Sequence, residues 1–158
     1  MIVLVMGVSS SGKNAIGEPL AQRLGWKFID GDDYHPPENV KKMAAGIPLQ
    51  DEDRWPWLDR LNALLRKEKD AVLACSALKE AYRRRLLDGV RESAIVHLRG
   101  SFDLIRRRAE QRKHRYMPAS LLQSQFDALE PPRDAIEVDV SQDVQASVER
   151  IVKALSGR

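Results

Sequence analysis

The sequence has few of the features that mark secreted, membrane-spanning or disordered chains. Cys75 is the single cysteine among 158 residues, so no disulfide can form within the chain and a reducing compartment is favoured. No apolar run approaches the roughly 20 residues that cross a bilayer. The apolar run Ile2–Met6 lacks the basic leader and the length of a signal peptide. We therefore expect a cytoplasmic protein.

The composition indicates one soluble globular domain. Hydrophobic residues make up 43% of the chain and charged residues 31%, which is far from the composition of a disordered protein. A length of 158 residues is close to the roughly 150 residues of one domain. No internal repeat, low-complexity segment or linker divides the sequence. Residues 1–158 are therefore expected to fold as a single domain.

Short apolar runs alternate with longer segments of helical periodicity. This alternation predicts an α/β fold, in which a mostly parallel sheet carries helices on both faces. The five predicted strands are Ile2–Met6, Lys27–Asp30, Ala71–Cys75, Ala94–Leu98 and Ala135–Val138. The predicted helices are Lys13–Leu24, Pro37–Ala45, Arg54–Glu68, Lys79–Gly89, Phe102–Arg112, Ala119–Leu129 and Gln142–Leu155.

A glycine-rich segment follows the first predicted strand. It matches the Walker A pattern G-x-x-x-x-G-K with its final Ser/Thr replaced. The glycines of such a loop let successive backbone N–H groups point at a phosphate, while Lys13 and the positive end of the next helix add charge. The segment therefore predicts an ATP site formed by Gly7, Val8, Ser9, Ser10, Ser11, Gly12, Lys13 and Asn14.

Asn14 is the departure from the Walker A pattern. Serine or threonine normally gives its hydroxyl to Mg²⁺ at this position. An asparagine amide oxygen is also a hard oxygen ligand, although its side chain is longer. We expect Asn14 to serve a working but weakened Mg²⁺ site. The alternative is a protein that binds nucleotide and sugar acid without efficient catalysis.

Acidic residues follow the second predicted strand, where Asp30, Asp32 and Asp33 precede His35. Ligands of open α/β sheets bind beyond the carboxyl ends of the strands, so we expect Asp32 and Lys13 to share one cavity. A carboxylate there accepts the proton of an attacking hydroxyl and aims it at the γ-phosphorus of ATP. A solvated turn is the alternative interpretation of this cluster.

At these motifs the sequence resembles the gluconokinase family, thermoresistant type, over nearly the whole chain. The family's Gly-Val-Ser-x-Ser-Gly-Lys corresponds to Gly7–Lys13, and its Gly-Asp-x-x-His-Pro corresponds to Gly31–Pro36. Further segments match the family as well, and several of all these motifs are specific to gluconokinases rather than general to P-loop proteins. The further segments are Asn39–Met43, Gly46–Leu58, Cys75–Lys79 with Tyr82 and Arg83, and Ser124–Phe126 with Leu129 and Glu130.

The resemblance implies an ATP:D-gluconate 6-phosphotransferase, usually a homodimer, with a P-loop NTPase fold similar to nucleoside monophosphate kinases and shikimate kinases. By position, Asp32 would be the base on the acceptor side, and Asp30 would touch Mg²⁺ through water. Basic side chains clamp carboxylates well. The residues that the resemblance assigns to gluconate are His35, Arg54, Lys79 and Arg83.

An arginine-rich stretch resembles the small helical lid of such kinases, around residues 106–120. Lid arginines neutralise charge in the transition state while the closed lid excludes water. By position, Arg108 and Arg112 match the catalytic lid arginines of the family. The family's Gly-His-Phe after the lid is not kept here, so no role is assigned to His114 or Arg115.

Two other functions fit parts of the sequence. A kinase for another small acid or for a nucleoside monophosphate would share the P-loop, but Asp32–Pro37 and Cys75–Lys79 argue against these acceptors. The arginine stretch would also suit a nucleic-acid binder, and the net charge is +3. However, no nucleic-acid-binding motif is visible, and phosphates bound there would compete with closure over ATP. We therefore expect neither a nucleic-acid nor a membrane partner.

Overall fold

The computed structural model describes residues 1–111 and 119–158, and it contains a five-stranded sheet with strand order β2-β3-β1-β4-β5. All strand pairs are parallel. The predicted sheet is therefore confirmed. Its strands are β1 (Ile2–Met6), β2 (Lys27–Asp30), β3 (Ala71–Ala74), β4 (Ser93–Arg99) and β5 (Ile136–Asp139).

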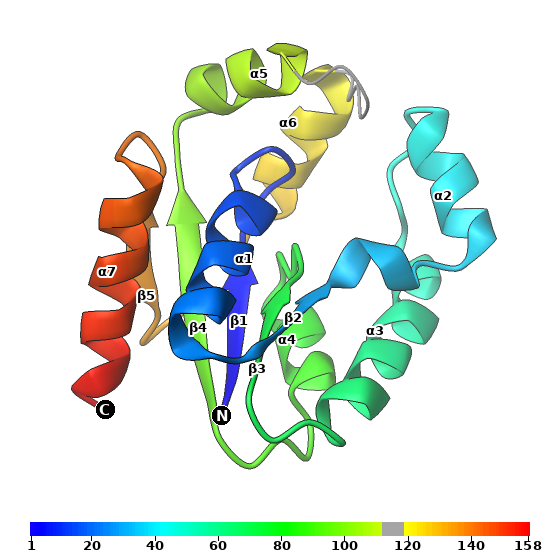
Figure 1. The fold of residues 1–158 in the computed structure, drawn as a ribbon. Helices are drawn as coiled ribbons and strands as arrows, with labels where there is room; N and C mark the ends of the chain where they lie inside the picture. The colour runs from blue at the N-terminus through cyan, green and yellow to red at the C-terminus, as the bar shows by residue number, and fades with distance from the viewer. Residues whose placement is uncertain (112–118) are drawn as a thin grey trace.

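Helices cover both faces of this sheet, as Figure 1 shows. The sequence predicted each α-helix within a few residues of its observed bounds, but it did not predict η1 (Gly31–Tyr34), a short 3-10 helix after β2. Among the described residues, none of these helices has both the length and the apolar character needed to cross a membrane. The α-helices are α1 (Lys13–Leu24), α2 (Pro37–Ala44), α3 (Asp51–Leu65), α4 (Glu80–Leu86), α5 (Phe102–Gln111), α6 (Ala119–Ala128) and α7 (Val144–Ser156).

Successive side chains of β1 point to opposite faces of the sheet, and a hydrophobic core lies on each face. Leu4 and Met6 pack with residues of α3 and α4, whereas Val3 and Val5 pack with residues of α1 and α7. Each of these four side chains is 0% exposed, and full burial of such a side chain contributes about 1.5–3 kcal/mol. A strand buried on both faces needs an unbroken apolar run, which is why β1 is easily recognised in the sequence.

The first turn of α3 begins earlier than predicted, at Asp51 rather than Arg54. The carboxylate of Asp53 accepts a hydrogen bond of 2.8 Å from the backbone N–H of Gln50 and an ion-pair contact of 2.9 Å from Lys42. A carboxylate at this place satisfies a backbone donor that the helix itself leaves unpaired. With the earlier start, Arg54 is the fourth residue of α3 rather than its first.

Three neighbouring strands end on the segments that the sequence singled out. β1 leads into the glycine-rich loop, β2 into η1, and β3 into the segment Cys75–Lys79. Carboxyl ends of parallel strands lie at one edge of a sheet, and Figure 1 shows α5 and α6 above that edge. Within the predicted lid, the structure describes α5 and the start of α6; Arg112, His114 and Arg115 lie outside the described residues.

Candidate active site

The glycine-rich loop connects β1 to α1 and will be called the P-loop, residues Gly7–Asn14. A Cβ at Gly7 would lie 2.6 Å from the Ser11 hydroxyl oxygen, so no side chain fits there. Gly12 has φ 99°, in the left-handed region that glycine adopts without strain, and it caps the N-terminus of α1. Both glycines are therefore required by the local geometry of the loop.

Lys13 is folded onto its own loop. Its Nζ donates to the carbonyl oxygens of Gly7, at 3.0 Å, and Val8, at 2.9 Å. The ammonium therefore lies over the concave side of the P-loop, where it is also within reach of an anion. A phosphate is a stronger partner for an ammonium than a neutral carbonyl, so an anion in the loop would draw Lys13 away from these carbonyls.

Asn14 is tied to the acidic side of the site through Asp30. The amide Nδ2 of Asn14 donates to Asp30 Oδ2 at 2.8 Å, and Asp30 Oδ1 accepts from the backbone N–H of Asp32 at 3.0 Å. Because the amide nitrogen faces Asp30, the carbonyl oxygen of Asn14 is the atom presented to other partners. The predicted metal ligands are thus adjacent, and Asp30 also caps the turn that carries Asp32.

These two residues fit an Mg²⁺ site of the kind found in phosphoryl-transfer enzymes. Within residues 1–111 and 119–158, no group of three or more His, Cys, Asp or Glu side chains is arranged to hold a metal. Mg²⁺ usually keeps several waters and binds one or two protein oxygens together with substrate phosphates. An amide oxygen from Asn14 and a water held by Asp30 match that pattern.

His35 lies against Asp32. Its Nε2 is 3.7 Å from Asp32 Oδ1, and the His35 side chain is 3% exposed whereas that of Asp32 is 48% exposed. Burial lowers the pKa of His35 from 6.5 to about 4; the carboxylates of Asp32 and Asp30 oppose this shift, and the charge of Arg54 adds to it. The imidazole is therefore neutral near pH 7, beside a carboxylate that reaches solvent.

Arg54 and Lys79 belong to a network on the other wall of the site. Arg54 Nη1 donates to the Leu49 carbonyl at 2.6 Å and to the Tyr82 hydroxyl at 3.3 Å. The Tyr82 hydroxyl donates to Asp51, and Lys79 Nζ lies 3.9 Å from the same carboxylate. Burial is the main cause that raises the pKa of Tyr82 to about 12, so the hydroxyl stays protonated as a donor.

Two clefts meet between these groups. The first, which we call the Arg54 cleft, has a volume of about 320 Å³ and is lined by Asp32, His35, Arg54 and Lys79 among others. The second, the P-loop cleft, has a volume of about 480 Å³ and is lined by most of the P-loop. Ser9, Lys13 and Asp32 line both clefts. The expectation that Asp32 and Lys13 share a cavity therefore holds.

The chain has close relatives among known proteins. A family model described as shikimate kinase matches residues 9–155. The chain is 45% identical to a probable gluconokinase of Xenopus tropicalis, over 96% of this chain and 91% of the relative. It is 38% identical to the thermoresistant gluconokinase of Escherichia coli K12, over 98% of this chain and 93% of that protein. The chain belongs to the gluconokinase family.

Solved structures agree with membership of the gluconokinase family. The crystal structure of a gluconokinase from Sinorhizobium meliloti 1021 matches with a TM-score of 0.91 at 43% identity, covering 98% of this chain and 90% of that chain. A shikimate kinase from Aquifex aeolicus matches with a TM-score of 0.72 at 17% identity, covering 99% of this chain and 97% of that chain. The second likeness shows the fold alone, which is that of a P-loop kinase.

Arg83 departs from the place that the gluconokinase motif implied. Its side chain does not line the Arg54 cleft, and the residue is only 5% exposed. The guanidinium donates to the carbonyls of Ala77, at 2.8 Å, Leu78, at 3.1 Å, and Glu130, at 2.9 Å. The guanidinium is therefore bonded to three backbone oxygens, which does not fit the direct contact with gluconate that the resemblance implied.

The position of Arg83 explains how the segment after β3 keeps its shape. Ala77 has φ 43°, a left-handed conformation that costs a non-glycine residue about 1–2 kcal/mol. Arg83 holds the Ala77 carbonyl and so stabilises this conformation. Ser76, Leu78 and Lys79 of the same segment line the Arg54 cleft. Arg83 thus supports one wall of the cleft from behind.

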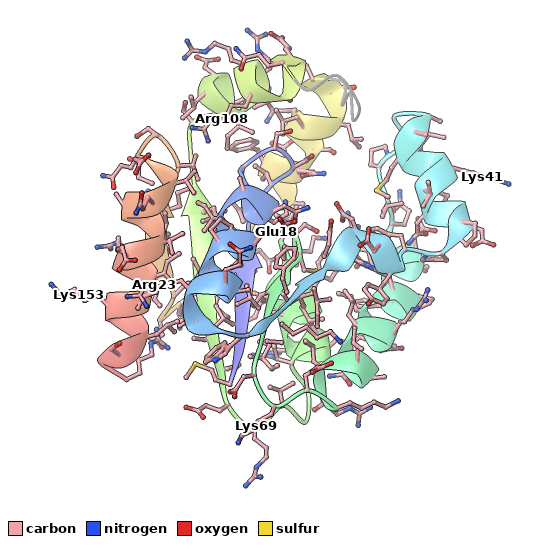
Figure 2. The ribbon with its side chains drawn as sticks, in the orientation of Figure 1. Glu18, Arg23, Lys41, Lys69, Arg108 and Lys153 are labelled. Atoms are coloured by element: carbon pink, nitrogen blue, oxygen red, sulfur yellow. The ribbon has the colours of Figure 1, made fainter. Side chains whose placement is uncertain are left out.

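Two further helices, α5 and α6, contribute Arg108 and Gln125 to the surroundings of the P-loop. Figure 2 shows Arg108 extending from α5 toward the connection between β5 and α7, where its Nη2 donates to the Val140 carbonyl at 2.5 Å. Arg108 also lines the P-loop cleft. Gln125 Oε1 accepts from the backbone N–H of Ser9 at 2.7 Å, which ties α6 to the P-loop.

Sequence reasoning recognised motif segments at Gln125 and Tyr82 but did not assign either residue to the site. Both line the Arg54 cleft. A signal for Tyr82 was its spacing from Lys79, because residues three apart on a helix lie on one face. No comparable signal existed for Gln125, since its partner Ser9 is 116 residues away in the sequence.

Proposed function

We propose that this protein is a gluconokinase that transfers the γ-phosphoryl group of ATP to the 6-hydroxyl of D-gluconate, giving 6-phosphogluconate and ADP. The observation that carries this proposal is that Lys13 and Asp32 line both clefts. A nucleotide tail held by the P-loop and a hydroxyl held in the Arg54 cleft would therefore meet between these two side chains. The curated relatives named gluconokinase, in bacteria and eukaryotes, support the same activity.

Asp32 is the acceptor-side base in this proposal. Its carboxylate is half-exposed and adjoins the P-loop cleft, so it reaches a substrate hydroxyl without a large movement. The hydroxyl oxygen forms a bond to the γ-phosphorus, the bond from that phosphorus to the β,γ-bridging oxygen breaks, and the hydroxyl proton passes to Asp32. Positioned acid–base groups of this kind contribute about 10²–10⁴-fold to rate.

The P-loop is the ATP site in this proposal. The backbone N–H groups at the N-terminus of α1 face the phosphates, and Lys13 exchanges its two carbonyl partners for the β- and γ-phosphates. Arg108, on the far wall of the same cleft, neutralises charge on the transferring group. Asn14 Oδ1 and a water held by Asp30 would hold Mg²⁺, which would supply positive charge to the phosphates.

Gluconate binds in the Arg54 cleft in this proposal. A volume of about 320 Å³ lies near the lower end of the roughly 300–1,000 Å³ of small-molecule pockets. Arg54 and Lys79 clamp the carboxylate, and His35 and Asp32 bind hydroxyls. Arg83 is not included, because its guanidinium is bonded to three backbone carbonyls.

The assembly and compartment are further parts of the proposal. We infer a homodimer, which the likeness to the family implies, and a cytoplasmic location without nucleic-acid or membrane partners. The single thiol suits a reducing compartment: Cys75 is buried, and burial raises its pKa to about 12, so it is held as an unreactive thiol.

Turnover with a panel of acceptors tests the activity. The protein is incubated with Mg-ATP and gluconate, related sugar acids, shikimate or AMP, and ADP release is measured together with the mass and ³¹P spectrum of the product. We expect ADP release with gluconate, a phosphorylated carbon at position 6, and little turnover with shikimate or AMP. If no sugar acid stimulated ADP release, the proposed activity would be refuted, and a protein that binds these ligands without catalysis would be favoured.

A further inference from the structure

The imidazole of His35 is held on one face and at both ring nitrogens. The ring stacks on Trp57, with centroids 3.9 Å apart and planes inclined by 17°. Trp57 is itself fixed, because its Nε1 donates to the Gly31 carbonyl at 2.8 Å. Since Gly31 opens η1, the stack attaches the ring to the turn that carries Asp32. His35 therefore has one orientation relative to Asp32.

Asn39 determines which ring nitrogen carries the proton. Its Nδ2 donates to the backbone carbonyl of Asp53 at 2.9 Å, and a carbonyl only accepts, so the amide nitrogen must face this way. The same Nδ2 lies 3.2 Å from His35 Nδ1. Because an amide nitrogen only donates, Nδ1 of the ring must accept, which leaves the proton of the neutral ring on Nε2.

The protonated nitrogen faces the Arg54 cleft. His35 Nε2 lies 3.7 Å from Asp32 Oδ1, and both residues line that cleft. The charged groups that act on the ring are Asp32 and Asp30 from the β2–η1 turn and Arg54 from α3. The neutral ring then offers a donor next to an acceptor, and a hydroxyl is the simplest group that satisfies both at once.

We propose that Asn39 is a positioning residue that locks His35 as the Nε2–H tautomer, so that His35 and Asp32 together bind one substrate hydroxyl as its donor and its acceptor. The inference rests on the proposed function, and it adds a residue that touches no substrate. It also predicts a substrate class: the acceptor must present a hydroxyl at this point, because an ether oxygen accepts from Nε2–H but cannot donate to the Asp32 carboxylate, and a hydrogen does neither.

The tautomer is measured directly by ¹⁵N NMR of histidine-labelled wild-type protein. The chain has three histidines, and the His35→Gln variant assigns the signals of His35. We expect an unprotonated Nδ1 and a protonated Nε2 between about pH 6 and pH 8. A protonated Nδ1 in the wild type would overturn the proposal, whatever the activity of the protein.

The Asn39→Asp variant tests the role of the amide. A carboxylate accepts instead of donating, so it should move the ring proton to Nδ1 and raise the pKa of His35. We expect the gluconate KM to rise about tenfold, the loss of one hydrogen bond of roughly 1.4 kcal/mol, while the ATP KM stays within about twofold. The His35→Gln variant, which keeps a side-chain N–H donor, should be less impaired than His35→Leu.

Asn62→Asp is the matched control. Asn62 is also a buried asparagine whose amide donates to two backbone carbonyls, those of Leu86, at 2.8 Å, and Asp88, at 2.7 Å, and within residues 1–111 and 119–158 it has no hydrogen bond with a histidine. We expect Asn62→Asp to lower stability and to leave the gluconate KM within about twofold. Equal rises in gluconate KM for both variants would refute the proposal. A wild type with the expected tautomer but no sugar-acid turnover would instead refute the proposed function.

Discussion

The phosphate-binding loop of the site is one continuous stretch of chain, whereas the acceptor side is assembled from several distant ones. The residues Gly7–Asn14 contain the phosphate-binding loop, the Lys13 ammonium and the N-terminus of α1. The Arg54 cleft draws on η1, α3, the segment after β3, α4 and α6. A contiguous site forms as soon as its own segment adopts the right backbone geometry. An assembled site forms only when the strands and helices that carry its residues have packed in their native arrangement. Substitutions on the two sides should therefore separate nucleotide binding from acceptor binding.

The largest effect is expected at Lys13. Lys13→Met removes the ammonium that would neutralise the transferring phosphate, and we expect kcat to fall by about 10³-fold. The dissociation constant for gluconate, measured by calorimetry, should stay within about twofold. Lys41→Met is the control, since Figure 2 shows Lys41 pointing away from α2 into solvent. If Lys13→Met weakened gluconate binding as strongly as it slowed turnover, the two sides would not be separable.

Arg54 and Arg83 give the next contrast, because the same residue type has different surroundings. Arg54→Leu should raise the gluconate KM by about 10–100-fold, the loss of charged hydrogen bonds of roughly 1.5–3 kcal/mol. Arg83→Leu leaves three backbone carbonyls without their donor, so thermal unfolding should show a lower Tm by several degrees, about 2–4 °C per kcal/mol. A rise in gluconate KM for Arg83→Leu equal to that for Arg54→Leu would restore Arg83 as a direct ligand.

The buried His35 makes the stability of the folded protein depend on pH. Its pKa is lowered from 6.5 to about 4 on folding, so the unfolded chain binds more protons between these values and stability falls as pH drops through that window. Chemical denaturation should show this loss between pH 6.5 and about 4, and it should be smaller in His35→Gln. Burial also lowers the pKa of His97, which remains in both proteins. Identical pH profiles for the two proteins would contradict a buried neutral His35.

The smallest effect is expected at Asn14, on the phosphate side. Asn14→Ser restores the usual hydroxyl ligand, and we expect Mg²⁺ affinity and kcat to rise by up to about tenfold. Calorimetric titration of Mg²⁺ in the presence of ADP checks binding separately from turnover. Glu18→Gln, at an exposed position of α1, should change neither quantity. If Asn14→Ser also changed neither, position 14 would not be a metal ligand.

The sheet and the P-loop were predictable because their signals are local. β1 is an apolar run that is buried on both faces, and the P-loop glycines are required locally, Gly7 by its contact with Ser11 and Gly12 by its positive φ. The early start of α3 was missed, because it depends on the Asp53 carboxylate capping Gln50. Helices are recognised in a sequence from the spacing of their apolar residues. Neither the Asp53 cap nor η1 changes that spacing, so neither could be recognised from the sequence.

The acceptor side was only partly predictable, and Arg83 shows why. A motif gives the residue type but not the direction of its side chain. Arg83 and Tyr82 are adjacent on α4, yet the Tyr82 side chain lines the Arg54 cleft and that of Arg83 does not. The acceptor that draws Arg83 away, the Glu130 carbonyl, is 47 residues distant. Asn39 was likewise seen within a motif, but its effect on His35 depends on the Asp53 carbonyl of α3.

The most direct test of the shared-cavity account is the rate of phosphoryl transfer in Asp32→Asn. This substitution keeps the size of the side chain but removes the proton acceptor between the two clefts. Rapid-quench single-turnover measurements with saturating Mg-ATP and gluconate should show the transfer rate reduced by about 10²–10⁴-fold, with the ADP dissociation constant unchanged within about twofold. A transfer rate within about threefold of the wild type would contradict the claim that Asp32 and Lys13 act on the same pair of reacting atoms.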